Sequence, residues 1–105
     1  MCLYEEQTPI DIEIVESALS SVPGDWRRFS LNLEHVLAAD PDEMGTVRLS
    51  LVNGEQPWPA DDGLYGAALK LLRLFHRYGI HWVRARYEIH MIEDGKWKYE
   101  IDFQY

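Results

Sequence analysis

The residues best suited to metal or thiol chemistry are four histidines and one cysteine. His35, His76, His81 and His90 do not form the His-Glu-x-x-His pattern, which places two metal ligands and a general base on one helix face. Cys2 has no second thiol beside it in the sequence, so the ligand set of a structural zinc site is missing as well. The sequence therefore predicts no metal centre.

Acids, bases and nucleophiles also fail to combine into a catalytic pattern. Glu34 and His35 are neighbours in a predicted strand, where successive side chains point to opposite faces. The chain has neither a Gly-x-Ser-x-Gly nucleophile turn nor a glycine-rich phosphate loop. We therefore expect no catalytic residues and no cofactor, and we predict that the protein is not an enzyme.

The distribution of charge is more informative than any motif. The 105 residues carry 18 acidic and 10 basic side chains, for a net charge of −8. Residues 1–62 hold 13 acids and 3 bases, whereas residues 63–105 hold 5 acids and 7 bases. This balance argues against a phosphate-binding surface and against attraction to anionic membranes, and it favours a basic partner.

A candidate binding surface lies in the loops of the acidic half. Trp58 stands between two prolines as a rigid aromatic side chain of the kind enriched at interfaces. The acids predicted to surround it are Asp40, Asp42, Glu43, Glu55, Asp61 and Asp62. Two interpretations remain open: a docking surface that steers a basic protein, or acidic loops that confer solubility around a tryptophan that caps the core.

A competing candidate is a strip of bases with aromatic neighbours, as in proteins that bind single-stranded nucleic acids. Its members are Arg84, Arg86, Lys96, Lys98, Trp82 and His90. Glu88, Glu100 and Asp102 are predicted on the same face, which makes the surface one of mixed charge. Nucleic-acid binding is disfavoured for this reason.

The first half of the chain predicts one helix and two strands. Thr8 and Pro9 are suited to the start of a helix, and Pro23-Gly24 ends its apolar stripe, so residues 1–7 are expected to form a loose arm. Apolar and polar residues alternate from Phe29 to Leu33 and again over residues 46–52, which predicts a hairpin with a long polar loop.

The second half predicts a loop, a helix and a second hairpin. Residues 55–63 are rich in proline and aspartate and are expected to lack regular structure. A helix follows over residues 64–78, with Gly79 suited to its left-handed end. The last two strands are predicted to join through a three-residue loop, Glu93-Asp94-Gly95, because that register alone keeps the apolar residues on one face. It opposes Met91 to Trp97, Ile89 to Tyr99, Tyr87 to Ile101, Ala85 to Phe103 and Arg86 to Asp102.

These elements predict a single α+β domain over residues 1–105 in the order α-β-β-α-β-β. Two one-sided hairpins and two amphipathic helices are best satisfied by a four-stranded antiparallel sheet with both helices packed on one face. The order of the strands remains open. A lone cysteine, and the lack of any run near the roughly 18 apolar residues that span a bilayer, predict a cytoplasmic location.

Several aromatic and turn motifs carry a resemblance to a known family. The first helix ends in Val22-Pro23-Gly24-Asp25-Trp26-Arg27-Arg28, Trp82 opens the last hairpin, and the chain closes with Asp94-Gly95-Lys96-Trp97-Lys98-Tyr99-Glu100-Ile101-Asp102-Phe103-Gln104-Tyr105. In these motifs the chain resembles the YezG-like immunity proteins of bacterial polymorphic toxin and contact-dependent growth inhibition systems.

The resemblance implies a small cytoplasmic immunity protein. Such a protein binds the C-terminal toxin domain of a sibling or self effector, often a nuclease, and blocks it. A nuclease presents a basic surface to phosphates, which an acidic protein can occlude. We expect a monomer in a 1:1 complex with the toxin domain, with no nucleic-acid or membrane partner.

Two other functions remain as alternatives. One is a small homodimeric adaptor or regulatory domain that uses an exposed sheet edge. The other is an enzyme that binds a small molecule on the concave face of the sheet. No residue pattern supports either one.

Overall fold

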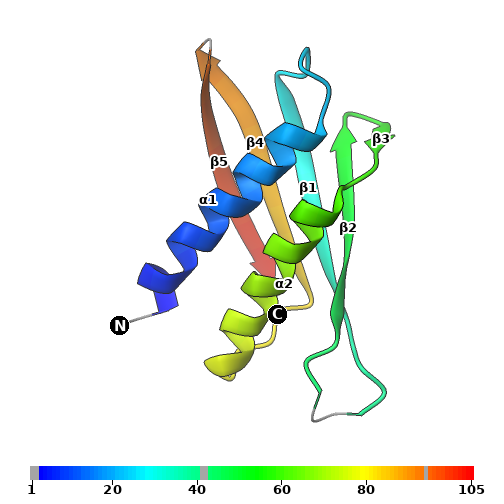
Figure 1. Ribbon diagram of the computed structural model, residues 1–105, viewed down its shortest axis with the longest axis vertical. Helices are drawn as coiled ribbons and strands as arrows, with labels where there is room; N and C mark the ends of the chain where they lie inside the picture. Colours follow the sequence, from blue (N-terminus) through cyan, green and yellow to red (C-terminus); the bar gives the residue numbers. More distant parts are fainter. Residues whose placement is uncertain (1–2, 41–42, 94) are drawn as a thin grey trace.

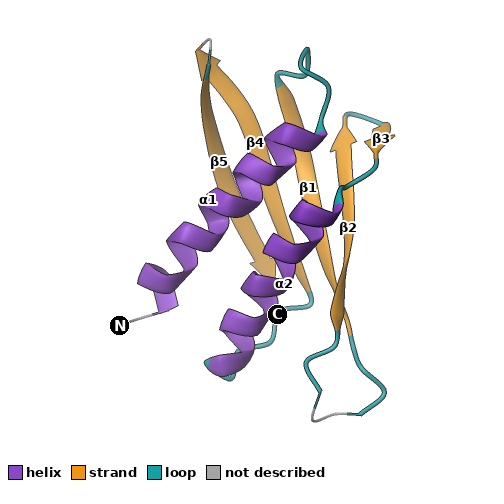
Figure 2. Ribbon diagram, viewed as in Figure 1, coloured by secondary structure: helices purple, strands orange, loops and turns teal. Residues whose placement is uncertain are grey.

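Two helices cover one face of a five-stranded antiparallel sheet, as the computed structural model of residues 3–40, 43–93 and 95–105 shows (Figure 1). The elements are α1 (Leu3–Ser21), β1 (Arg28–Val36), β2 (Thr46–Asn53), β3 (Gln56–Trp58), α2 (Asp62–Arg77), β4 (Arg84–Glu93) and β5 (Lys96–Gln104). The strand order is β3-β2-β1-β4-β5. Figure 2 shows α1 and α2 side by side on the same face of the sheet. The predicted α+β class and two-layer packing are therefore confirmed, and the predicted number of strands is wrong by one.

Helix α1 begins earlier than the sequence predicts. It starts at Leu3, with Pro9 inside it, so residues 3–7 are helical and are not a loose arm. Leu3 and Ile10 lie seven residues apart on one helix face, and both pack against the core. This burial offsets the cost of a proline within a helix.

The fifth strand lies in the segment that was expected to be irregular. Gln56–Trp58 forms β3, which pairs with β2 so that Pro57 stands opposite Val52. A proline is tolerated in a strand at the edge of a sheet, because one side of such a strand needs no hydrogen-bond donors. The prediction of an irregular loop over residues 55–63 is therefore wrong for these three residues and for Asp62 and Gly63, which begin α2.

The last hairpin has the predicted register. Met91 pairs with Trp97, Ile89 with Tyr99, Tyr87 with Ile101, Ala85 with Phe103, and Arg86 with Asp102. The turn differs, because Glu93 pairs with Lys96 and a register irregularity between Met91 and Glu93 takes up the extra residue. The loop is thus shorter than the predicted three residues. Its Gly95 has the expected positive φ of 77°, and Asp94 lies outside the described residues.

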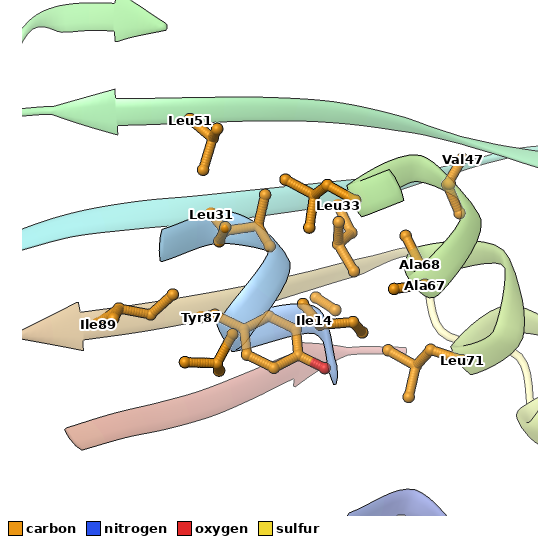
Figure 3. Packing of buried hydrophobic residues seen from close by; sticks show 14 of the residues in the cluster. Ile14, Leu31, Leu33, Val47, Leu51, Ala67, Ala68, Leu71, Tyr87 and Ile89 are labelled. Atoms are coloured by element: carbon orange, nitrogen blue, oxygen red, sulfur yellow. The ribbon is translucent and has the colours of Figure 1, made fainter. Parts of the chain in front are cut away.

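The core fills the space between the sheet and the helices (Figure 3). Leu31, Tyr87 and Ile89 project from the sheet toward Ile14 of α1 and Leu71 of α2, and all five are fully buried. Helix α2 carries clear signals at both of its ends. Asp61 caps the start of α2, and Gly79 follows its end with a φ of 71°. None of the helices in the described ranges combines the length and apolar character needed to cross a membrane.

Candidate functional site

The acids of the predicted binding surface separate into two groups at opposite ends of β2. Asp40 and Glu43 lie in the loop between β1 and β2, here called the β1–β2 loop acids. Glu55, Asp61 and Asp62 lie around β3 and the start of α2, here called the β3-side acids. Strand β2 has eight residues and is therefore about 25 Å long, so one small contact surface cannot include both groups. Asp42 lies outside the described residues.

Trp58, the predicted anchor, is joined to its own fold. Its indole Nε1–H donates a 2.6 Å hydrogen bond to the backbone carbonyl of Ser21, at the end of α1. Its ring meets the ring of Trp26 edge to face, with 5.7 Å between centroids. The side chain is half-buried. Trp58 therefore attaches β3 to α1, as the core-capping interpretation requires, while part of its side chain stays exposed.

Asp61 has a structural role beside any role in binding. Its side chain accepts a 2.8 Å hydrogen bond from the backbone N–H of Leu64 and so caps α2. This bond, with a further one from Ser21, holds the pKa of Asp61 below its ordinary value. Asp62 lies in the first turn of α2, where the helix dipole favours an acid.

Three acids of these two groups carry uncompensated charge. Glu43, Glu55 and Asp62 are exposed and form no ion pair with any described residue. The acids that do form ion pairs lie elsewhere on the surface: Glu6, Glu13, Glu34, Glu88 and Glu93. An uncompensated exposed carboxylate is available to a basic partner at little desolvation cost.

A small pocket of about 310 Å³ adjoins the β1–β2 loop acids. Three histidines, His35, His76 and His81, line it together with Asp40 and Glu43. The ring of His35 is already engaged, because its Nε2 lies 2.7 Å from the carbonyl oxygen of Met44. Among the residues that the structure describes, no group of three or more such side chains is arranged to hold a metal ion.

The face of the sheet that the helices leave open carries a shallow groove of about 650 Å³. Its charged lining consists of Arg48, Arg84, Arg86, Glu34 and Asp102. The strand registers set these side chains in rows across the sheet, in which Glu34 stands between Arg48 and Arg84. The mixed charge expected on this face is therefore confirmed, and this alternation of sign is poorly suited to a nucleic-acid backbone. Trp82, which was expected in the same strip, is instead buried in the core against Phe75 and Phe103.

Ser30, Arg86 and Glu88 form a connected group on the same face. The hydroxyl of Ser30 donates to Glu88 at 2.9 Å, and the guanidinium of Arg86 lies 2.5 Å from the same carboxylate. Glu34 also points to this face and lies 3.8 Å from Arg48, whereas the ring of its neighbour His35 packs near Trp82. The predicted separation of Glu34 from His35 is confirmed.

Sequence reasoning missed one buried acid. Asp11 lies on α1 and is only 5% exposed. Tyr87 Oη donates to its Oδ1 at 2.6 Å, and Gln7 Nε2 donates to its Oδ2 at 3.2 Å. Asp11 precedes Ile14, Val15 and Ala18 by three, four and seven residues, and this helical spacing was the available signal.

No protein-family model matches the chain. A search of curated proteins likewise finds no significant match.

Proposed function

We propose that this chain is a cytoplasmic immunity protein that binds a cognate bacterial toxin domain through a basic surface of that domain and neutralises it by occlusion. The proposal rests on the motif resemblance and on one structural observation. Glu43, Glu55 and Asp62 are exposed carboxylates without an ion-pair partner among the described residues, in a chain of net charge −8. Charge of this kind accelerates encounter with a basic protein and disfavours acidic ones.

The β3-side acids are the better candidate for the contact itself. Glu55 and Asp62 lie three and four residues from Trp58, whose partly exposed ring packs on the buried Trp26, so a partner would meet a rigid, partly apolar surface with an acidic border. Binding interfaces commonly combine an aromatic centre with a polar rim. The β1–β2 loop acids lie at the far end of β2 and contribute to the long-range field in this proposal.

Co-expression tests the proposal directly. The protein is produced together with the candidate toxin domain encoded immediately upstream, and both complex formation and cell survival are scored. We expect a stoichiometric complex with one toxin domain per chain, and survival that depends on the chain. Toxicity that persists without complex formation, across all neighbouring toxin candidates, contradicts the proposal.

A charge-matched pair of variants locates the contact. Glu55→Lys combined with Asp62→Lys changes the β3-side acids. Glu5→Lys combined with Glu16→Lys makes the same change in net charge on the exposed surface of α1. We expect the first variant to lose rescue and the second to retain it. Equal behaviour of the two variants would show that net charge alone matters.

A further inference from the structure

The outer edge of β5 is an unpaired sheet edge among the described residues. No described strand pairs with it, since β5 stands last in the strand order. The opposite edge of the sheet is β3, which has three residues and contains Pro57. Short strands and prolines are common means of blocking edge-to-edge pairing. Strand β5 has nine residues, no proline, and no charged side chain on its inner face.

The backbone of β5 offers a regular set of unpaired groups at this edge. His35 N donates to Val83 O, and Met91 N donates to Arg27 O, so the odd-numbered residues of β4 direct their backbone groups to β1. Because these directions alternate along a strand, the even-numbered residues of β4 face β5, and their partners in β5 are even-numbered too. The N–H and C=O groups of Trp97, Tyr99 and Ile101 therefore point outward.

Two rows of like charge also end at this edge. Arg28, His90 and Lys98 stand side by side across β1, β4 and β5 on the open face of the sheet, with no acid in the row. The adjacent row sets Glu88 beside Glu100, a pairing of like charges that is destabilising within one chain. Glu88 is paired with Arg86, whereas Lys98 and Glu100, the two residues of these rows on β5, form no ion pair with any described residue.

We propose that a second copy of this chain pairs with the edge of β5, antiparallel and with Tyr99 opposite Tyr99 of the other copy. In this register Lys98 stands opposite Glu100 of the other copy, and Lys96 stands opposite Asp102. The two-fold symmetry of the dimer makes each pair occur twice, so four pairs of opposite charge form across the edge. The two sheets become one continuous sheet of ten strands.

Only this register places every charged residue of β5 opposite a residue of the other sign in the second copy. A pairing centred on Glu100 sets two glutamates against each other, and one centred on Ile101 opposes Glu100 to Asp102. A pairing centred on Lys98 or Trp97 opposes lysines. Registers centred between residues are excluded, because they would set the inner face of one strand against the outer face of the other.

The same register suits the inner face and completes the charge rows. Trp97 stands opposite Ile101 of the other copy, and these side chains are half-buried in the single chain, with apolar surface left to cover. The acidic row that ends in Glu100 continues into the basic row that begins with Lys98 of the other copy. The proposed dimer differs from the monomer expected from the sequence. It leaves the β3-side acids free, since they lie toward the other edge of the sheet.

Charge reversal and charge exchange test the pairing independently of any toxin. Lys98→Glu sets two carboxylates against each other across the edge, and Glu100→Lys sets two ammonium groups against each other, so each variant turns two attractive pairs into repulsive ones. Sedimentation equilibrium of the full chain should show a wild-type dimer of twice 12.3 kDa. Each single variant should have a dissociation constant at least about tenfold higher. Arg73→Glu, on the exposed surface of α2, makes the same charge change as Lys98→Glu and should leave the dimer intact.

The decisive arms are the mixture and the double variant. When the Lys98→Glu and Glu100→Lys chains are mixed, both cross-edge pairs become complementary, and a heterodimer should form with at least wild-type affinity. The chain that carries both substitutions should again form a homodimer. A wild-type chain that is monomeric at every concentration overturns the proposal. So does a mixture of the two single variants that fails to associate while circular dichroism shows both to be folded.

Discussion

The hydroxyl of Tyr87, on the central strand β4, donates a 2.6 Å hydrogen bond to the carboxylate of Asp11 on α1, and both side chains are buried. This contact is a polar connection between the helical layer and the sheet, within an otherwise apolar interface. Burial raises the pKa of Asp11, while the hydrogen bonds from Tyr87 and Gln7 oppose that rise. The fold therefore holds this carboxyl group where its ionisation costs more free energy than in the unfolded chain.

Asp11→Asn is expected to remove a pH-dependent loss of stability. The pKa of Asp11 in the folded chain lies above its ordinary value of 3.8, so the folded state holds this proton more tightly than the unfolded state does. The contribution of Asp11 to stability is fully present below that ordinary value and is lost as pH rises through the folded pKa. Urea unfolding should therefore show that the free energy of unfolding of Asp11→Asn gains on wild type between pH 4 and pH 7.

Tyr87→Phe is the matched comparison for that substitution. It removes the donor and leaves the buried carboxylate with one hydrogen bond fewer, so it should lower the free energy of unfolding at pH 7 by about 1–3 kcal/mol. If the free energy of unfolding changed with pH in the same way for Asp11→Asn and for wild type, the pH dependence predicted above would not come from Asp11.

Trp58→Phe separates the structural role of Trp58 from a role in binding. Phenylalanine keeps a ring against Trp26 but leaves the carbonyl of Ser21 without its indole donor. We expect a loss of about 1 kcal/mol in the free energy of unfolding, measured by urea titration. An unchanged midpoint would indicate that water replaces the indole at Ser21. In that case the half-buried ring would be more readily available to a partner.

The capping role of Asp61 predicts a second measurable cost. Asp61→Ala should lower the free energy of unfolding by about 1 kcal/mol at pH 7. Because the pKa of Asp61 is lowered in the folded chain, wild type should lose this advantage as pH falls through the folded pKa. Asp62→Ala is the control, and it should cost less because Asp62 does not cap the helix. Equal costs for the two would contradict the assignment of the cap.

Gly45 is expected to be the least replaceable residue of the β1–β2 loop. Its φ is 82°, and a Cβ atom at this position would lie 2.3 Å from the carbonyl oxygen of Val36. Gly45→Ala should therefore cost at least about 2 kcal/mol in thermal or urea unfolding. Gly54→Ala, at a φ of 62° but in open space, isolates the backbone part of that cost. If the two substitutions cost the same, the close approach to Val36 is relieved by movement of the loop.

The sequence predicts much of this fold because its local patterns agree with one another. The alternation in β4 and β5 sets the register, since a slip of one residue would expose Tyr87 and Ile89. Local patterns give wrong predictions where contacts between distant parts of the chain determine the secondary structure. Pro9 resembles a helix start, but the packing of Leu3 extends the helix past it. Pro57 resembles a strand breaker, but it lies on an edge.

The candidate site is less predictable, because its residues are far apart in the sequence. The spacing of Glu43 and Glu55 does not reveal that they lie at opposite ends of β2. Two prolines beside Trp58 suggested a rigid exposed anchor, whereas its hydrogen bond to Ser21 depends on the position of α1. The polarity of Asp11 is typical of an exposed residue, and only its helical spacing from Ile14 and Val15 indicates the buried face.

The proposed function is tested most directly by calorimetric titration of the purified upstream toxin domain into this chain at low and moderate salt. We predict one toxin domain bound per chain, an affinity that falls as salt rises, and an affinity at least about tenfold weaker for Glu55→Lys/Asp62→Lys than for Glu5→Lys/Glu16→Lys. No heat of binding to any toxin domain encoded beside this chain would contradict the account. Binding that is indifferent to both salt and the β3-side substitutions would contradict the role given to the acidic surface.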